Sequence, residues 1–108
     1  MSNAEVLDRL FATIEGRRDA DPDSSWTAQL FAEGRPKIVR KFGEEAVEVT
    51  VAALVEGREA LTAESADLLY HLLVVWADAG IQAQDVWDAL AEREGTSGIF
   101  EKQSRSDT

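Results

Sequence analysis

The chain of 108 residues has no cysteine and only one histidine, and both scarcities exclude whole classes of chemistry. Without cysteine there is no disulfide framework, thiol nucleophile or cysteine-ligated zinc site. His71 alone cannot build a zinc site from several histidines, and no Gly-x-Ser-x-Gly nucleophile pattern accompanies it. No apolar run reaches the roughly 18 residues of a membrane span, and the first residues do not resemble a secretion signal. We therefore expect a cytoplasmic protein.

Basic residues are also scarce, with 11 against 21 acidic ones and a formal net charge of −10. Such a charge opposes general electrostatic binding to nucleic acid or to an anionic membrane, so we expect neither partner. Hydrophobic residues make up 44% of the chain, which is enough for one small folded domain.

Apolar residues at helical spacing, separated by glycines and short polar segments, predict helices and no strands. We expect an all-α domain over residues 1–95, with two long central antiparallel helices, and a polar tail over 96–108. The predicted helices are 6–14, a short one from Trp26 capped by Ser24 or Ser25, Pro36 to about Glu56, about Ala60 to Ala79, and about Gln84 to Glu94.

The third predicted helix carries a charged stripe about 100° wide on an otherwise apolar surface. Because a surface helix normally has a broad polar face, we expect neighbours to wrap this helix on most sides and its stripe to line a cleft. Acidic side chains this close repel one another, which favours a bound cation. The stripe consists of Lys37, Lys41, Glu44, Glu45 and Glu48.

The fourth predicted helix adds a second acidic pair, Glu64 and Asp67, on one face. Antiparallel packing of the two long helices brings this pair to the acidic part of the stripe, forming a five-carboxylate cluster. Oxygen ligands of this kind suit Mg²⁺ or Mn²⁺, and Mg²⁺ often completes its shell with substrate phosphates. Basic residues that precede the cluster are placed to hold polyphosphate oxygens, namely Arg35, Lys37, Arg40 and Lys41.

A plainer interpretation makes the stripe a solvated helix face with Lys–Glu pairs, and the chain a non-enzymatic helical interaction module. The acidic pair on a second, largely apolar helix argues against it, because charges rarely enter such surroundings unpaired. We interpret His71 as a hydrogen-bonded residue that packs or supports a metal ligand, in preference to a catalytic base. We interpret Trp26, Trp76 and Trp87 as core or interface residues in preference to base-stacking groups.

The motif Lys41-Phe-Gly-Glu44-Glu45-Ala-Val-Glu48 followed by Glu64-Ser-Ala-Asp67 resembles the all-α nucleoside triphosphate pyrophosphohydrolases related to MazG. Ser25-Trp26-Thr27 and the Ser97-Gly98 segment with Glu101-Lys102 are similar to one branch, the phosphoribosyl-ATP pyrophosphohydrolases of histidine biosynthesis. The resemblance covers about residues 5–105. It implies a MazG-like helical bundle completed by a homodimer.

The resemblance also implies Mg²⁺-dependent hydrolysis of 1-(5-phosphoribosyl)-ATP to 1-(5-phosphoribosyl)-AMP and pyrophosphate, the second step of L-histidine biosynthesis. A house-cleaning NTP or dNTP pyrophosphohydrolase of the same superfamily is the alternative. Glu44, Glu45 and Glu48 are then the catalytic acids, with Glu44 positioning or activating water. The implied metal ligands are Glu45, Glu48, Glu64 and Asp67, and the implied phosphate or substrate contacts are Arg35, Lys37, Lys41, Lys102 and Arg105, the last two closing over the substrate.

Overall fold

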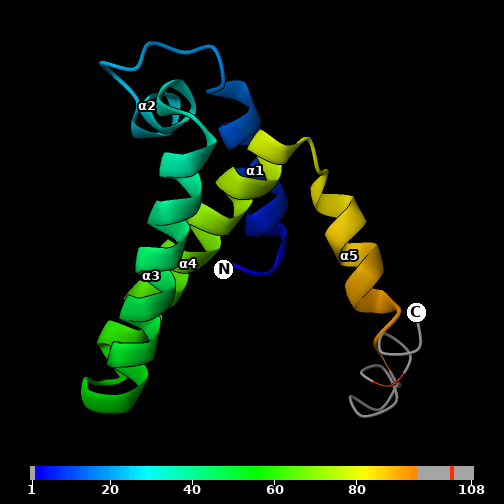
Figure 1. Cartoon of the computed structure of the whole chain (residues 1–108). Coiled ribbons are helices and arrows are strands. Elements are labelled where there is room, and N and C mark those ends of the chain that lie inside the picture. Colours follow the sequence, from blue (N-terminus) through cyan, green and yellow to red (C-terminus); the bar gives the residue numbers. More distant parts are fainter. Residues whose placement is uncertain (1, 95–102, 104–108) are drawn as a thin grey trace.

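Short polar loops and single glycines divide the chain into helices, as the sequence pattern predicts. The computed structural model describes residues 2–94 and 103, and residues 2–94 contain five helices and no strand (Figure 1). The all-α prediction is confirmed. The helices are α1 (Glu5–Gly16), α2 (Trp26–Glu33), α3 (Arg35–Val55), α4 (Arg58–Ala79) and α5 (Ala83–Ala91).

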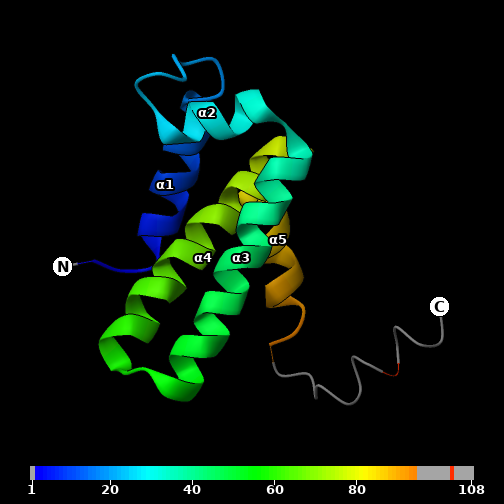
Figure 2. The ribbon, with the colours of Figure 1, turned by 60° about the vertical axis from the view of Figure 1, so that its left-hand side comes forward.

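The two long helices, α3 and α4, form the antiparallel pair that the sequence predicts (Figure 2). Only Glu56 and Gly57 separate them, and both residues have extended backbone conformations. So short a connection forces the chain to reverse and lays the two helices side by side. The first half of α4 therefore lies beside the second half of α3.

Helix ends follow from residues with special capping chemistry. Ser25 caps α2, because its Oγ accepts a hydrogen bond from the Ala28 N–H at 3.2 Å. Gly34 ends α2 with φ +92° and directly precedes α3, whose first turn contains Pro36. Gly80 ends α4 in the left-handed conformation, with φ +76°.

The core lies where α1, α2, α3 and α4 meet. Its five largest fully buried side chains come from all four helices, and burial of each contributes about 1.5–3 kcal/mol. Arg18 fastens the end of α1 to this region, because its guanidinium donates to the Ala77 carbonyl and lies 4.8 Å from the centre of the Phe31 ring. The five buried side chains are Ile14, Leu30, Ile38, Leu73 and Val74.

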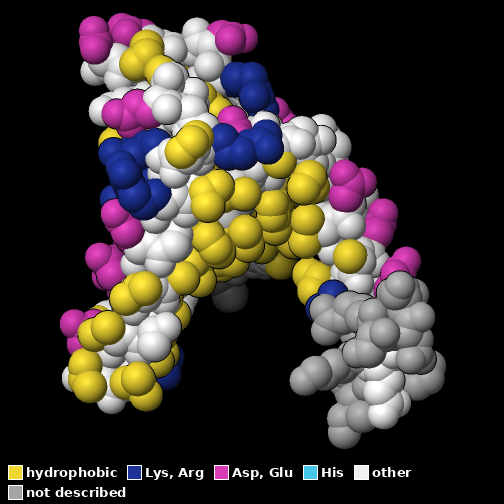
Figure 3. Space-filling model, in the orientation of Figure 1, with side chains coloured by type: hydrophobic (Ala, Val, Ile, Leu, Met, Phe, Trp, Pro, Cys, Tyr) yellow, Lys and Arg dark blue, Asp and Glu magenta, His cyan; other side chains and the backbone are white. Residues whose placement is uncertain are grey.

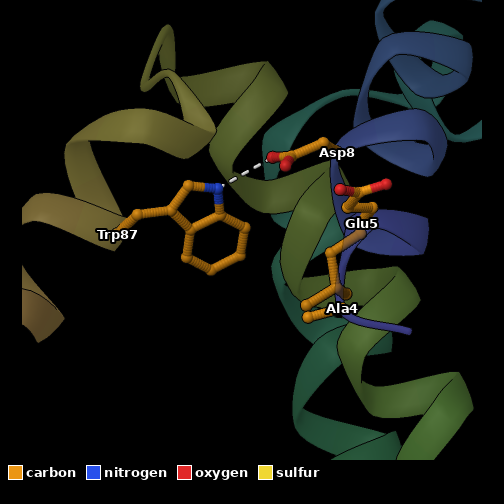
Figure 4. A pocket seen from close by; sticks show the side chains of 5 residues that line it. Ala4, Glu5, Asp8 and Trp87 are labelled. Carbon is orange, nitrogen blue, oxygen red and sulfur yellow. Dashed lines mark hydrogen bonds between the residues drawn. The ribbon is translucent and has the colours of Figure 1, made fainter.

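Helix α5 descends on the other side of an arch from the α3–α4 pair (Figure 1). Trp87 holds it to α1, because its Nε1–H donates to Asp8 Oδ1 at 2.8 Å (Figure 4). The Trp87 ring also meets Trp76 edge-on at 5.7 Å. A pocket of about 260 Å³ lies beside this contact, lined by Ala4, Glu5, Leu7, Asp8 and Trp87. None of the helices in the described part could cross a membrane.

The expectation that neighbours wrap α3 on most sides is wrong within one chain. Only Ile38, Glu45 and Ala52 of this helix are buried, and their spacing of seven residues marks a single narrow face. Leu54 and Val55, near the end of α3, are 78% and 76% exposed. Hydrophobic side chains accordingly cover much of the surface under the arch and along the lower part of α3 (Figure 3).

Candidate metal centre

Three carboxylates meet where α3 and α4 lie side by side. Glu45 and Glu48 are one turn apart on α3, and Glu64 approaches from α4. Each offers one oxygen, and these three oxygens lie within 4.8 Å of one another. Glu45 is buried, Glu64 is half-buried and Glu48 is exposed, so the group begins in the helix interface and opens to solvent. The predicted convergence of the two helices on acidic residues is therefore present for these three side chains.

Two oxygens of this group are buried with no hydrogen-bond donor in the described part of the chain as long as the carboxylates are charged. They are Oε2 of Glu45 and Oε2 of Glu64. Buried polar atoms are almost always paired in native proteins, so two neighbouring unpaired carboxylate oxygens call for a partner. An all-oxygen donor set of this kind fits a hard divalent cation such as Mg²⁺.

The crowding of negative charge also favours protonation. Burial is the main cause that raises the pKa of Glu45, and hydrogen bonding to Glu48 and the charges of Glu48 and Asp67 raise it further, while Lys41 opposes them. Hydrogen bonding to Glu48, followed by desolvation and the neighbouring charges, raises the pKa of Glu64 to about 7. A cation among these carboxylates would favour their charged forms instead.

Asp67 and Glu44 lie outside the group of three. Asp67 is exposed on α4, yet it is near enough for its charge to raise the pKa of both Glu45 and Glu64. Glu44 is also exposed, and its Oε2 pairs with Lys41 Nζ at 3.3 Å. In the single chain the stripe thus faces solvent over much of its length and does not line a closed cleft.

The predicted phosphate contacts have distinct surroundings. Lys37 pairs with Glu33 at 3.9 Å, and Lys41 lies between Glu44 and the Trp26 ring, whose centre is 6.0 Å from Nζ. Arg35 is engaged with the end of α4, where its Nε donates to Asp78 Oδ2 at 2.6 Å and its Nη2 to the Asp78 carbonyl at 3.0 Å. Lys102 and Arg105 lie outside the described residues. All five assignments stay predictions.

His71 is buried and hydrogen-bonded, as the sequence interpretation expects, although its Nε2 has no partner in the described part of the chain. The side chain is buried on α4, and its Nδ1 donates to the Asp67 carbonyl at 2.8 Å. The Tyr70 ring meets it edge-on, and the Tyr70 hydroxyl hydrogen-bonds with the hydroxyl of Thr27 on α2. Sequence reasoning missed this last contact because it joins residues 43 positions apart.

The chain is similar to proteins of a known family. A family model of phosphoribosyl-ATP pyrophosphohydrolase matches residues 7–94, a span that includes the three converging carboxylates. This chain belongs to that family. The resemblance predicted from the motifs is therefore confirmed.

Curated relatives in this family match almost end to end. Phosphoribosyl-ATP pyrophosphatase from Paramagnetospirillum magneticum is 58% identical over 104 residues, which cover 96% of this chain and 95% of the relative. The protein of the same name from Azospirillum brasilense is 56% identical over 103 residues, or 95% and 93% of the two chains. The one from Rhodospirillum rubrum is 60% identical over 101 residues, or 94% and 86%.

Proposed function

We propose that this protein hydrolyses 1-(5-phosphoribosyl)-ATP to 1-(5-phosphoribosyl)-AMP and pyrophosphate, the second step of L-histidine biosynthesis. The observation that carries the proposal is the convergence of Glu45, Glu48 and Glu64 in a chain of this family. The names of the matched relatives support the substrate. A biosynthetic reaction of a nucleotide agrees with the cytoplasmic location expected from the sequence.

The proposal includes Mg²⁺, with Mn²⁺ as a substitute, held by Glu45, Glu48 and Glu64 together with Asp67. The unpaired buried oxygens of Glu45 and Glu64 support this assignment. When bound, such an ion neutralises phosphate charge and lowers the barrier to nucleophilic attack.

In the proposed reaction, the chain's own residues bind the phosphates and prepare the water. Lys37 and Lys41 hold phosphate oxygens, and Glu44 orients the water and accepts its proton. The water oxygen forms a bond to phosphorus while the bond between the α- and β-phosphates breaks, which releases pyrophosphate. The position of Glu44 supports its role, because it lies beside Glu45 in sequence but outside the group of three, and its side chain is exposed to water.

We also propose that the active form is a homodimer. Val47, Val51, Leu54 and Val55 are large exposed apolar residues that recur at helical spacing on α3. A contiguous apolar surface of this kind marks an interaction site more often than a free surface in a monomer. The family resemblance makes a second copy of this chain the occupant.

The decisive experiment measures pyrophosphate release with phosphoribosyl-ATP and with a panel of dNTPs in the presence of Mg²⁺. We expect the wild-type chain to hydrolyse phosphoribosyl-ATP. Glu48→Gln and Asp67→Asn should each lower turnover by about 100-fold or more, because each removes a charged ligand of the ion. Glu59→Gln, an exposed position in the first turn of α4, is the matched control and should retain activity.

Circular dichroism should show the same helix content in all four proteins. Full turnover in a folded Glu48→Gln or Asp67→Asn variant would contradict the ligand assignment. Hydrolysis of dNTPs with none of phosphoribosyl-ATP would favour the house-cleaning alternative. Absence of Mg²⁺ binding by calorimetry, together with absence of any hydrolysis, would leave the non-enzymatic interaction module.

A further inference from the structure

Trp26 is a large aromatic residue that the core does not use. It is the first residue of α2 and remains 44% exposed, whereas Trp76 and Trp87 pack against each other. Its neighbours explain its orientation. Thr27 and Ala28 are both buried, and Thr27 is hydrogen-bonded to Tyr70 of α4. With the next two residues facing inward, the indole lies on the outer side of a fixed helix end.

Lys41 connects this exposed ring with the carboxylates. Its Nζ lies 6.0 Å from the centre of the Trp26 ring and 3.3 Å from Glu44 Oε2. Its positive charge also acts on Glu45, where it opposes part of the rise in pKa. Trp26, Lys41 and the carboxylate group therefore follow one another along one surface, with the aromatic ring at the end away from the carboxylates. Figure 3 shows basic side chains gathered in the region where α2 meets α3.

We propose that Trp26 stacks on the purine base of the nucleotide substrate and supplies the part of the affinity that depends on the presence of a base. This inference rests on the proposed function. A nucleotide whose phosphates lie at the carboxylates and Lys41 extends its sugar and base beyond them, and the Trp26 ring is the aromatic surface adjoining Lys41. Stacking between a base and an aromatic side chain accounts for about 5- to 150-fold in affinity.

Two other roles for Trp26 make different predictions. If the ring serves only to hold the Lys41 ammonium, its removal weakens binding of every polyphosphate, with or without a base. If it serves as a contact with a second copy, its removal changes the oligomeric state. Stacking alone predicts a loss that depends on the base.

The test compares two triphosphates, of which one carries a nucleoside and the other carries neither base nor sugar. These are α,β-methylene-ATP, which cannot be cleaved between the α- and β-phosphates, and inorganic tripolyphosphate. Calorimetry with Mg²⁺ gives their affinities for wild type, Trp26→Ala and Trp26→Phe. The control is Val6→Ala on α1, where the native side chain is also 44% exposed. Sedimentation velocity records the oligomeric state of each protein.

We expect Trp26→Ala to bind α,β-methylene-ATP about 5- to 150-fold more weakly and tripolyphosphate within twofold of wild type. Trp26→Phe should keep most of the affinity, and Val6→Ala should match wild type. In steady-state assays with phosphoribosyl-ATP, Trp26→Ala should raise KM by a similar factor and change kcat little, because stacking is made equally in the ground and transition states.

Three results would overturn the stacking role. They are equal losses for both ligands, no loss for α,β-methylene-ATP, and a changed sedimentation coefficient that accounts for the loss. Lack of measurable α,β-methylene-ATP binding by wild type would overturn it too. Failure of the proposed function has a separate signature. Wild type would then leave phosphoribosyl-ATP uncleaved, while the base-dependent loss in Trp26→Ala persists.

Discussion

Glu64 makes the stability of the metal-free protein depend on pH. Its pKa is about 7 in the folded chain, chiefly because of hydrogen bonding to Glu48, against a reference value of 4.5. The folded chain thus holds this proton more tightly than the unfolded chain. The resulting stabilisation is fully present below about pH 4.5 and is lost as the pH rises through about 7.

We therefore expect the unfolding midpoint in the presence of a chelator to fall between pH 5 and pH 8. In Glu64→Gln, which cannot ionise, the fall should be smaller. Mg²⁺ added at pH 8 should restore stability to the wild type more than to this variant, because the ion replaces the proton among the carboxylates. If the unfolding midpoints of the two proteins fell by the same amount between pH 5 and pH 8, Glu64 would not be the cause of the pH dependence.

Sequence spacing identifies the acidic residues but not their surroundings. Positions three apart on one helix share a face, which is enough to predict that Glu45 and Glu48 lie together and that Glu64 can meet them. The same rule cannot tell that Glu45 is buried while Glu48 is exposed. Nor can it find the pairing of Arg35 with Asp78, because those two residues are 43 positions apart. Burial and long-range pairing both depend on how the helices pack against one another, which the spacing along one helix does not determine.

At the scale of the helices, two glycines have different effects on stability. One only lowers the helix propensity of its position, and the other is required by its backbone conformation. Gly43 lies inside α3, and a Cβ added there meets no atom within 4 Å, so nothing in the packing requires a glycine. Gly80 ends α4 with φ +76°, where an L side chain is strained. The same substitution should therefore have opposite effects at the two positions.

We expect Gly43→Ala to raise the free energy of unfolding by about 1 kcal/mol and Gly80→Ala to lower it by about 1 kcal/mol. For a chain of this size each change shifts the thermal midpoint by about 4–8 °C. Urea and thermal unfolding of the two variants beside wild type measure both effects. A destabilised Gly43→Ala would reveal a contact at that position that the single chain lacks.

Helix boundaries are predictable where a residue has a conformational reason to stop the helix. Gly34 and Gly80 both end helices with positive φ, and Ser25 begins α2 with its side-chain cap. The end of α5 is less well predicted, because the helix ends at Ala91 and not at about Glu94. Only polar residues follow Ala91 in that stretch, so further helical turns would bury no apolar surface.

At the scale of the whole molecule, the apolar side chains of α3 remain exposed in the single chain. The sequence predicts that they are covered, yet in the single chain Val47 is 63% exposed and Leu54 still more so. Periodicity reports how many faces of a helix are apolar, but it does not report whether the cover comes from the same chain or another. The hollow under the arch in Figure 3 is bordered by apolar surface of the same kind.

If a second copy covers this surface, a charge placed in it should separate the two copies. Leu54→Asp puts a carboxylate into the proposed interface on a chain that already carries a net charge of −10, so desolvation and repulsion both oppose association. We expect wild type to sediment as a dimer and Leu54→Asp as a monomer at micromolar concentration, with its helix content retained. The control, Val6→Asp, adds the same charge at an exposed position on α1 and should remain dimeric. A wild-type monomer, or a Leu54→Asp dimer as stable as wild type, would mean that α3 is not the contact surface.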